Sequence, residues 1–229
     1  MPRVKLKRFR VKRPSPDALA RYLREYPGYD LYHHPDEQTP ITAEALFDRD
    51  PAPDDPPLVF DLGCGRGEFI VEQAAQHLDV LFVGFDWHEK SVWDAVNRAE
   101  RAGVDNVRIV KADVRLALRI VPDATVREVF MLFPPPASAE RRRKTDPLPE
   151  QTLREIHRVL EPGGPFHFVT DHAGYFAIKR TMIEESGLFE LAQVGQQIEG
   201  GLTRFQQFWE SREIESKRLE ARKRPAASD

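Results

Sequence analysis

The stretch VFDLGCGRGEF, Val59 to Phe69, decides the fold of this chain. A short apolar run stops at three alternating glycines, and the helically spaced segment 68–78 follows at once. In an open α/β sheet, ligands bind beyond the carboxyl ends of the strands. Glycine at such a position lets the backbone approach a ligand without a Cβ clash. The stretch therefore predicts a strand, a ligand-binding loop and a helix.

The spacing of the glycines narrows the kind of ligand. Gly63, Gly65 and Gly67 form G-x-G-x-G, whereas the dinucleotide fingerprint requires G-x-G-x-x-G and would need glycine where Glu68 stands. Glu68 would also bring a carboxylate to the helix N-terminus, where a pyrophosphate would sit. The pattern disfavours NAD, and no GK[ST] follows that would make a Walker loop.

Outward from this loop, apolar runs alternate with helically spaced segments. This alternation predicts βαβ units, and fully apolar runs suit a parallel sheet covered on both faces. We expect an α/β protein with a Rossmann-like, mostly parallel, doubly wound sheet and an antiparallel C-terminal edge hairpin. The expected strands cover 58–62, 80–86, 107–113, 126–133 and 165–171, with the hairpin at 188–194 and 203–210; the helices cover 17–26, 68–78, 89–103, 148–164 and 175–187.

Composition excludes several classes of protein. The chain has 229 residues and no run of 18 apolar residues, so a membrane span is not expected. The basic N-terminus lacks the apolar core of a secretory signal, and the single Cys64 allows no internal disulfide. The histidines show no metal-ligand spacing, so we expect no metal site. A cytoplasmic protein is the simplest interpretation; monomer and homodimer both stay open.

The net charge of −3 conceals three basic segments, at 1–13, 141–144 and 217–224. Either basic terminus alone is also compatible with a solvated tail. Three such segments on an acidic chain favour a polyanionic partner. Glu220 lies inside the third, which we expect to be a helix with a salt-bridged solvent face.

An acid two residues before G-x-G-x-G resembles the first motif of class I S-adenosylmethionine (SAM)-dependent methyltransferases. SAM carries a sulfonium and an ammonium group, so carboxylates suit it better than a phosphate cradle does. Asp61 precedes the loop, Asp86 ends the second strand near the expected ribose, and Asp113 ends the third near the expected adenine. Trp87 and Val114 follow as flanking residues, with core packing an open alternative for Trp87. A helix cap or loop turn is an open alternative for Asp113 alone.

Longer motifs make the resemblance more specific. The run of DLGCGRGEF, VGFDWHEKSV, NVRIVKADV, a strand ending in F-P-x-P before basic residues, and LEPGGPFHFVTD is similar to the tRNA (guanine(46)-N7)-methyltransferase family of the TrmB type. The resemblance implies SAM as cofactor, tRNA as partner, and methyl transfer to the variable-loop guanine. It also implies substrate contacts for Asp171 and Thr203 and for the cations Arg141, Arg142 and Arg143. Asp171 is also placed to cap the helix that follows it.

The stretch LFPPPASAERRRK, residues 132–144, departs from the family pattern. The family has F-P-D-P-W, whereas Pro135 stands here in place of the acid and Ala137 in place of tryptophan. Ala139 stands in place of a lysine, and Gln206 in place of a glutamate. The catalytic residue therefore stays unassigned. A catalytically impaired SAM- or RNA-binding module and a methyltransferase with another substrate remain alternatives.

These observations divide the chain into three parts. We expect a basic arm and Pro-rich extension at 1–57, the methyltransferase domain at 58–210, and a charged tail at 211–229.

Overall fold

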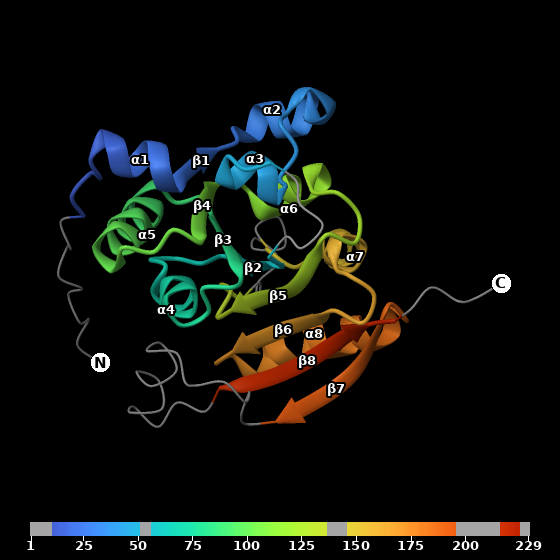
Figure 1. The fold of residues 1–229 in the computed structure, drawn as a ribbon. Helices are drawn as coiled ribbons and strands as arrows, with labels where there is room; N and C mark the ends of the chain where they lie inside the picture. The colour runs from blue at the N-terminus through green and yellow to red at the C-terminus, as the bar shows by residue number, and fades with distance from the viewer. Residues whose placement is uncertain (1–10, 51–55, 137–145, 196–215, 225–229) are drawn as a thin grey trace.

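The computed structural model describes residues 11–50, 56–136, 146–195 and 216–224. Eight strands of this described part form one sheet in the order β1-β4-β3-β2-β5-β6-β8-β7 (Figure 1). They are β1 (Leu23–Glu25), β2 (Leu58–Leu62), β3 (Leu81–Asp86), β4 (Val107–Lys111), β5 (Val126–Leu132), β6 (Pro165–Thr170), β7 (Phe189–Gly195) and β8 (Lys217–Lys223). Neighbours from β1 to β6 run parallel, and β8 is antiparallel to both β6 and β7. The expected α/β class and mostly parallel sheet are confirmed.

Helices cover both faces of the sheet (Figure 1). They are α1 (Pro16–Tyr22), α2 (Gly28–His33), η1 (Pro35–Glu37), α3 (Ala43–Phe47), α4 (Glu68–Gln76), α5 (Glu89–Ala102), α6 (Val114–Ala117), η2 (Leu118–Ile120), α7 (Glu150–Val159) and α8 (Ala173–Glu185). Buried side chains of α1, α4 and α5 pack on one face, and those of α3, α7 and α8 on the other. None of the described helices is long and apolar enough to cross a membrane.

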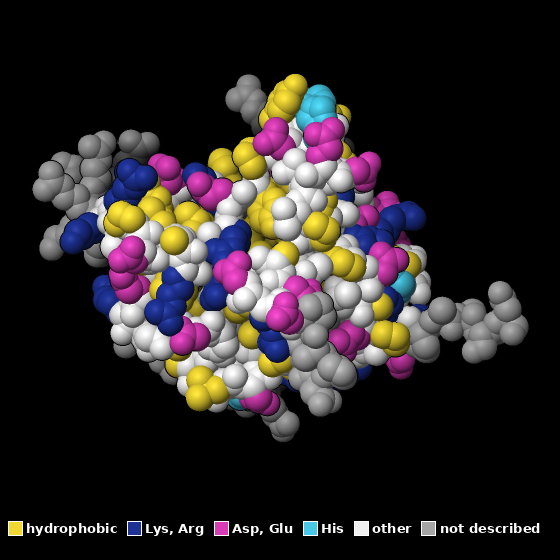
Figure 2. Space-filling model, turned by 45° about the horizontal axis from the view of Figure 1, so that its top comes forward, with side chains coloured by type: hydrophobic (Ala, Val, Ile, Leu, Met, Phe, Trp, Pro, Cys, Tyr) yellow, Lys and Arg dark blue, Asp and Glu magenta, His cyan; other side chains and the backbone are white. Residues whose placement is uncertain are grey.

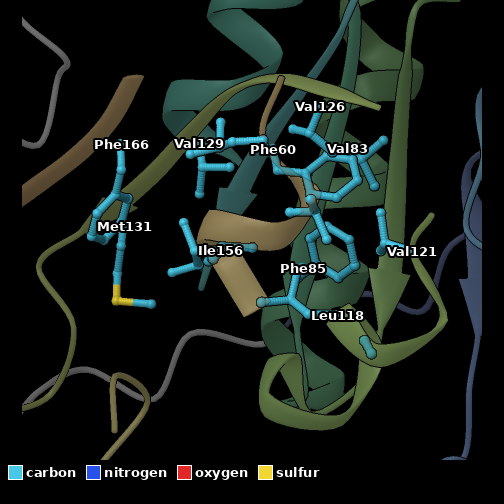
Figure 3. Packing of buried hydrophobic residues seen from close by; sticks show 14 of the residues in the cluster. Phe60, Val83, Phe85, Leu118, Val121, Val126, Val129, Met131, Ile156 and Phe166 are labelled. Atoms are coloured by element: carbon cyan, nitrogen blue, oxygen red, sulfur yellow. The ribbon is translucent and has the colours of Figure 1, made fainter. Parts of the chain in front are cut away.

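The central strands are buried on both faces, as their apolar sequences predict. Every residue of β2 is buried. Phe60 of β2 meets Phe85 of β3 edge to face, with ring centroids 5.0 Å apart. Ile156 of α7 lies close to this pair in the larger core (Figure 3). This packing fixes the carboxyl ends of β2 and β3 beside each other, at the edge where the glycine loop begins.

The C-terminal part of the sheet differs from the sequence prediction. The helix expected at 217–224 is wrong, because this segment is strand β8, inserted between β6 and β7. Leu219 and Ala221 alternate with charged residues and are buried against the core, which is a strand pattern of period two. The antiparallel pair at the C-terminus is confirmed, but β8 is its second strand. Residues 203–210, expected to be that strand, lie outside the described residues.

The N-terminal extension also joins the sheet. The helix expected over 17–26 ends at Tyr22, and Leu23–Glu25 becomes β1, paired in parallel with β4. Arg108 of β4 fastens α3 to this side: its Nε donates to the Leu46 carbonyl at 3.0 Å, and its guanidinium lies 4.4 Å from the centroid of the Phe47 ring. Because Glu25 of β1 pairs with Lys111 at the end of β4, the extension reaches the carboxyl edge of the sheet, where the glycine loop also lies.

A buried ionic cluster joins α8 to the segment before α7. Asp146 accepts hydrogen bonds from the Tyr175 hydroxyl at 2.7 Å and from Lys179 Nζ at 2.5 Å. Lys179 Nζ also donates to the Leu148 carbonyl at 2.5 Å, and the Lys179 side chain is only 4% exposed. A buried charge needs its partner, so this cluster holds α8 against residues 146–148, just before α7.

We expect Lys179→Met to lower the free energy of unfolding by about 3–5 kcal/mol, because Asp146 would keep a buried charge without its cation. Urea denaturation measures this change. Arg180→Met is the matched control: it removes an exposed ion pair with Glu184 on the same helix, which is worth about 1 kcal/mol or less. Equal small losses in the two variants would contradict a stabilising role for the cluster.

Candidate active site

The three glycines of the loop have left-handed backbone conformations. Their φ angles are 89° at Gly63, 55° at Gly65 and 71° at Gly67, where side chains are disfavoured. A Cβ on Gly67 would lie 2.8 Å from Ala95 Cβ, so this glycine permits close packing of the loop on α5. A Cβ on Gly63 or Gly65 would meet nothing within 4 Å. Space is therefore open above the first two glycines, as a ligand site requires.

The amides of the loop bind the end of β3. Gly63 and Cys64 both donate to the Phe85 carbonyl at 2.8 Å, and Gly65 donates to Asp86 Oδ2 at 3.1 Å. A phosphate-binding loop needs such N–H groups for its anion. Because they already have acceptors, the loop is poorly suited to a pyrophosphate, in agreement with the glycine spacing.

A pocket of about 230 Å³, here called the loop pocket, opens above the glycines. It is lined by Asp61, Gly63, Cys64, Gly65, Arg66, Glu68, Phe69, Leu132 and Phe133. Asp61 is 2% exposed, and its Oδ1 has no hydrogen-bond partner among the described residues. Burial, and next the charge of Asp86, raises the pKa of Asp61 to about 7. A buried acceptor without a donor fits a cationic ligand group such as the ammonium of SAM.

Asp86 lies at the end of β3, directly under the loop. Its Oδ1 accepts from the His88 amide at 2.7 Å, and its Oδ2 accepts from Gly65. Burial raises the pKa of Asp86, and these backbone hydrogen bonds oppose the rise. Each carboxylate oxygen has a second lone pair, so the fixed side chain can still accept from ribose hydroxyls.

A second pocket, of about 380 Å³, is here called the Trp87 pocket. It is lined by Glu25, Tyr26, Pro27, Gly28, Trp87, Lys111, Ala112 and Asp113. Trp87 is 76% exposed, so the alternative of core packing is wrong. Half of the lining comes from the N-terminal extension, which the sequence did not associate with the site. Both pockets lie at the carboxyl edge of the sheet, with Asp86 at the end of the strand between β2 and β4.

Asp113 is both a pocket residue and a helix cap. Its Oδ1 accepts from the Arg115 amide at 3.0 Å and caps α6, while its Oδ2 accepts from Arg115 Nη2 at 2.6 Å. Burial raises the pKa of Asp113, but the hydrogen bonds and charge of Arg115 outweigh it, and the pKa falls. The capping alternative is confirmed. Val114 begins α6 and packs, partly buried, against the larger core.

Residues 133–136, here called the proline corner, follow β5, and Phe133 lines the wall of the loop pocket. Phe133 has a φ of 51°, an unusual value for a non-glycine residue and more so before a proline. Its amide donates to the Val169 carbonyl of β6 at 2.7 Å. Pro134 is buried and Pro135 is exposed. Strain of this kind persists where the surroundings enforce it, and here it sets the pocket wall.

Of the predicted substrate residues, the structure describes only Asp171. Asp171 is exposed at the end of β6, and it makes no hydrogen bond or ion pair with the described residues. The alternative that it caps α8 is wrong, since His172 Nδ1 accepts from the Tyr175 amide at 3.0 Å and forms the cap. Arg141, Arg142, Arg143 and Thr203 lie outside the described residues.

Comparisons with known proteins agree with this geometry. A family model described as a putative methyltransferase matches residues 55–223. A curated tRNA (guanine-N(7)-)-methyltransferase of Rubrobacter xylanophilus is 35% identical over 216 residues, which are 93% of this chain and 95% of the relative. The chain belongs to this family. A second member, from Chloroflexus aggregans, is 37% identical over 77% of this chain and 76% of its own length.

Solved structures show the same fold at lower identity. A SAM-dependent methyltransferase from Aquifex aeolicus aligns with a TM-score of 0.52 at 16% identity, covering 91% of this chain and 93% of its own. A mutant 16S rRNA (adenine(1408)-N(1))-methyltransferase from Catenulisporales acidiphilia, determined with SAM, aligns with a TM-score of 0.56 at 16% identity, covering 77% and 89%. The family and the class I methyltransferase fold are therefore both shown.

The raised pKa of Asp61 makes stability depend on pH. The folded protein keeps this proton up to a pH of about 7, whereas the unfolded chain releases it near its ordinary pKa of 3.8. Asp61 therefore lowers the free energy of unfolding as the pH rises from about 4 to about 7, by at most about 4 kcal/mol. Asp61→Asn should lack this loss, so in urea denaturation the variant should gain on the wild type as the pH rises from about 4 to about 7. Parallel pH curves for the two proteins would contradict the assignment.

Proposed function

We propose that this protein transfers the methyl group of SAM to N7 of a guanine in tRNA. One observation carries the proposal: the chain matches a curated tRNA (guanine-N(7)-)-methyltransferase along 95% of that relative's length. The geometry supports it, because the loop pocket runs from the unsatisfied carboxylate of Asp61 to the strained corner at Phe133. The variable-loop guanine-46 is the target that the family resemblance implies.

We assign each of three acids at the carboxyl edge of the sheet to a different part of the cofactor. Asp61 would meet the ammonium, Asp86 the ribose hydroxyls, and Asp113 the adenine amino group. Trp87, which lines the Trp87 pocket, and Val114, the residue after Asp113, would flank the adenine. When bound, SAM supplies an electrophilic methyl group on a cationic sulfur. The loop glycines Gly63, Gly65 and Gly67 give it room to approach the backbone.

The reaction requires little acid–base catalysis by the protein. Guanine N7 has a lone pair and no proton, so attack on the methyl group needs alignment of nucleophile, carbon and sulfur. The methylated purine gains positive charge, which a carboxylate stabilises. Pro135 supplies neither charge nor donor. Asp171 offers a carboxylate at the end of β6, next to β5, and we assign it to the substrate side.

Contact with tRNA would involve the cations that follow the proline corner, Arg141, Arg142 and Arg143, together with Thr203. On the coloured part of the face in Figure 2, basic and acidic side chains are interspersed. A phosphate backbone favours clustered cations. The basic segments outside the described residues are therefore the proposed RNA contacts, and the cytoplasm, where tRNA is modified, is the proposed location.

Methyl transfer from labelled SAM to unmodified tRNA, followed by nucleoside analysis, tests the proposed function. We expect labelled 7-methylguanosine, and we expect Asp86→Ala to lower the affinity for SAM by about tenfold or more, because charge-assisted hydrogen bonds to the ribose would be lost. Label in another nucleoside would indicate a different substrate. SAM binding without transfer to tRNA would favour a binding module and contradict the proposal.

Asp171→Asn should lower kcat by up to about 10²-fold while the Kd for SAM stays unchanged, because the carboxylate acts on the purine and does not contact the cofactor. Calorimetry gives the Kd and single-turnover assays give the rate. Asp36→Asn, an exposed acid of η1, is the matched control and should leave both quantities unchanged. An unaltered rate in Asp171→Asn would remove this residue from the substrate side.

A further inference from the structure

The amino-acid end of SAM carries two opposite charges, an ammonium and a carboxylate. The proposed function, on which this inference rests, accounts for the ammonium through Asp61. The carboxylate would enter the loop pocket, whose lining includes a second acid, Glu68, and whose loop lies on Asp86. Without a cation nearby, Asp61, Glu68 and Asp86 would repel the carboxylate of SAM.

Four backbone amides of the loop already have acceptors within the protein. The amides of Gly63, Cys64 and Gly65 already donate to the end of β3, and the Gly67 amide donates to the Cys64 carbonyl at 2.9 Å. A loop that binds an anion through its backbone would present these N–H groups to the ligand. With these four amides occupied, a side chain of the loop is favoured as the partner of the carboxylate.

Arg66 is suitably placed. Among the described residues that line the loop pocket, it carries the only positive charge. Its Nε lies 3.0 Å from Asp94 Oδ2 of α5, which orients the guanidinium plane. The Arg66 carbonyl accepts from Arg98 Nε at 3.2 Å, so the backbone is held as well.

Arg98 provides a cationic partner for Glu68, the second acid in the pocket lining. Its Nη2 donates to Glu68 Oε1 at 3.1 Å, so the acid at the start of α4 has its own cation. Arg98 does not line the pocket, whereas Arg66 does. The ion pair between Glu68 and Arg98 reduces the repulsion at the pocket wall, and Arg66 adds the attraction.

We propose that the Arg66 guanidinium binds the carboxylate of the amino-acid end of SAM, and of the product S-adenosylhomocysteine. Guanidinium matches carboxylate with two parallel N–H···O hydrogen bonds, which fixes position as well as charge. Arg66 is thus a cofactor-positioning residue. It would hold the amino-acid end of SAM while the methyl group would lie toward the proline corner.

Calorimetry with two ligands tests this contact directly. Decarboxylated SAM has the same sulfonium, amine and adenosine but lacks the carboxylate. We expect Arg66→Gln to weaken SAM roughly 10- to 100-fold, as for one charge-assisted interaction, and to change the Kd of decarboxylated SAM by less than about twofold. Arg66→Lys, which keeps the charge but loses the paired hydrogen bonds, should give an intermediate loss for SAM only.

Arg98→Gln is the matched control, with the same loss of charge outside the pocket. Because it leaves Glu68 without its cation, it should weaken SAM slightly more than decarboxylated SAM, by a much smaller ratio than Arg66→Gln gives. A carboxylate-dependent loss in Arg98→Gln as large as in Arg66→Gln would overturn the direct contact in favour of a general field effect. Equal losses for both ligands in Arg66→Gln, with an unchanged melting temperature, would overturn it too. If Arg66→Gln fails to fold, the same comparison in Arg66→Lys decides.

The wild type separates this inference from the proposed function. Wild-type protein that binds neither ligand would overturn the cofactor assignment and this contact with it. Wild-type protein that binds SAM and methylates tRNA, but whose Arg66 variants show no carboxylate-dependent loss, would overturn the contact alone.

Discussion

The site depends on the way the glycine loop is fastened to the end of β3. Two amides share the Phe85 carbonyl and a third binds Asp86. This requires left-handed backbone at Gly63 and Gly65, which glycine adopts without strain. The chain thus turns away from β2 and leaves space above the loop. Without this attachment, Asp86 would lose one of the two backbone hydrogen bonds that hold its carboxylate.

The same attachment creates an electrostatic cost that a ligand can offset. Asp61 is buried beside Asp86 with an acceptor atom unsatisfied, so its charge is destabilising in the unliganded protein. An ammonium group would supply both the missing donor and the opposite charge. Binding an ammonium group at Asp61 would relieve this destabilisation, so stability lost at the site would favour a cationic ligand over a neutral one.

Local patterns explain which parts the sequence predicted. Helix α5 buries residues at helical spacing and ends at Gly103, whose φ is 65°, so both its face and its end could be inferred. Strand β8 could not, because charged residues hide the alternation of Leu219 and Ala221, and its place between β6 and β7 is a tertiary property. Strand β1 has three residues, too few to show a period. The wall that the N-terminal extension adds to the Trp87 pocket follows from that same short pairing.

At the site, the sequence located acids by their place after strands but gave no account of what holds them. The cap of Asp113 is local and was an open alternative from the sequence, and its ion pair with Arg115 lies two residues away. The left-handed Phe133, by contrast, is held by the Val169 carbonyl of β6, far along the chain. Pro135 removes a charge from the β5 corner, yet the left-handed Phe133 still sets the pocket wall there. Methyl transfer to a lone pair depends first on alignment and only second on a neighbouring charge. The corner therefore still supplies the rigid backbone geometry that the reaction needs most. Asp171, the residue directly after β6, remains as a carboxylate at the end of the neighbouring strand.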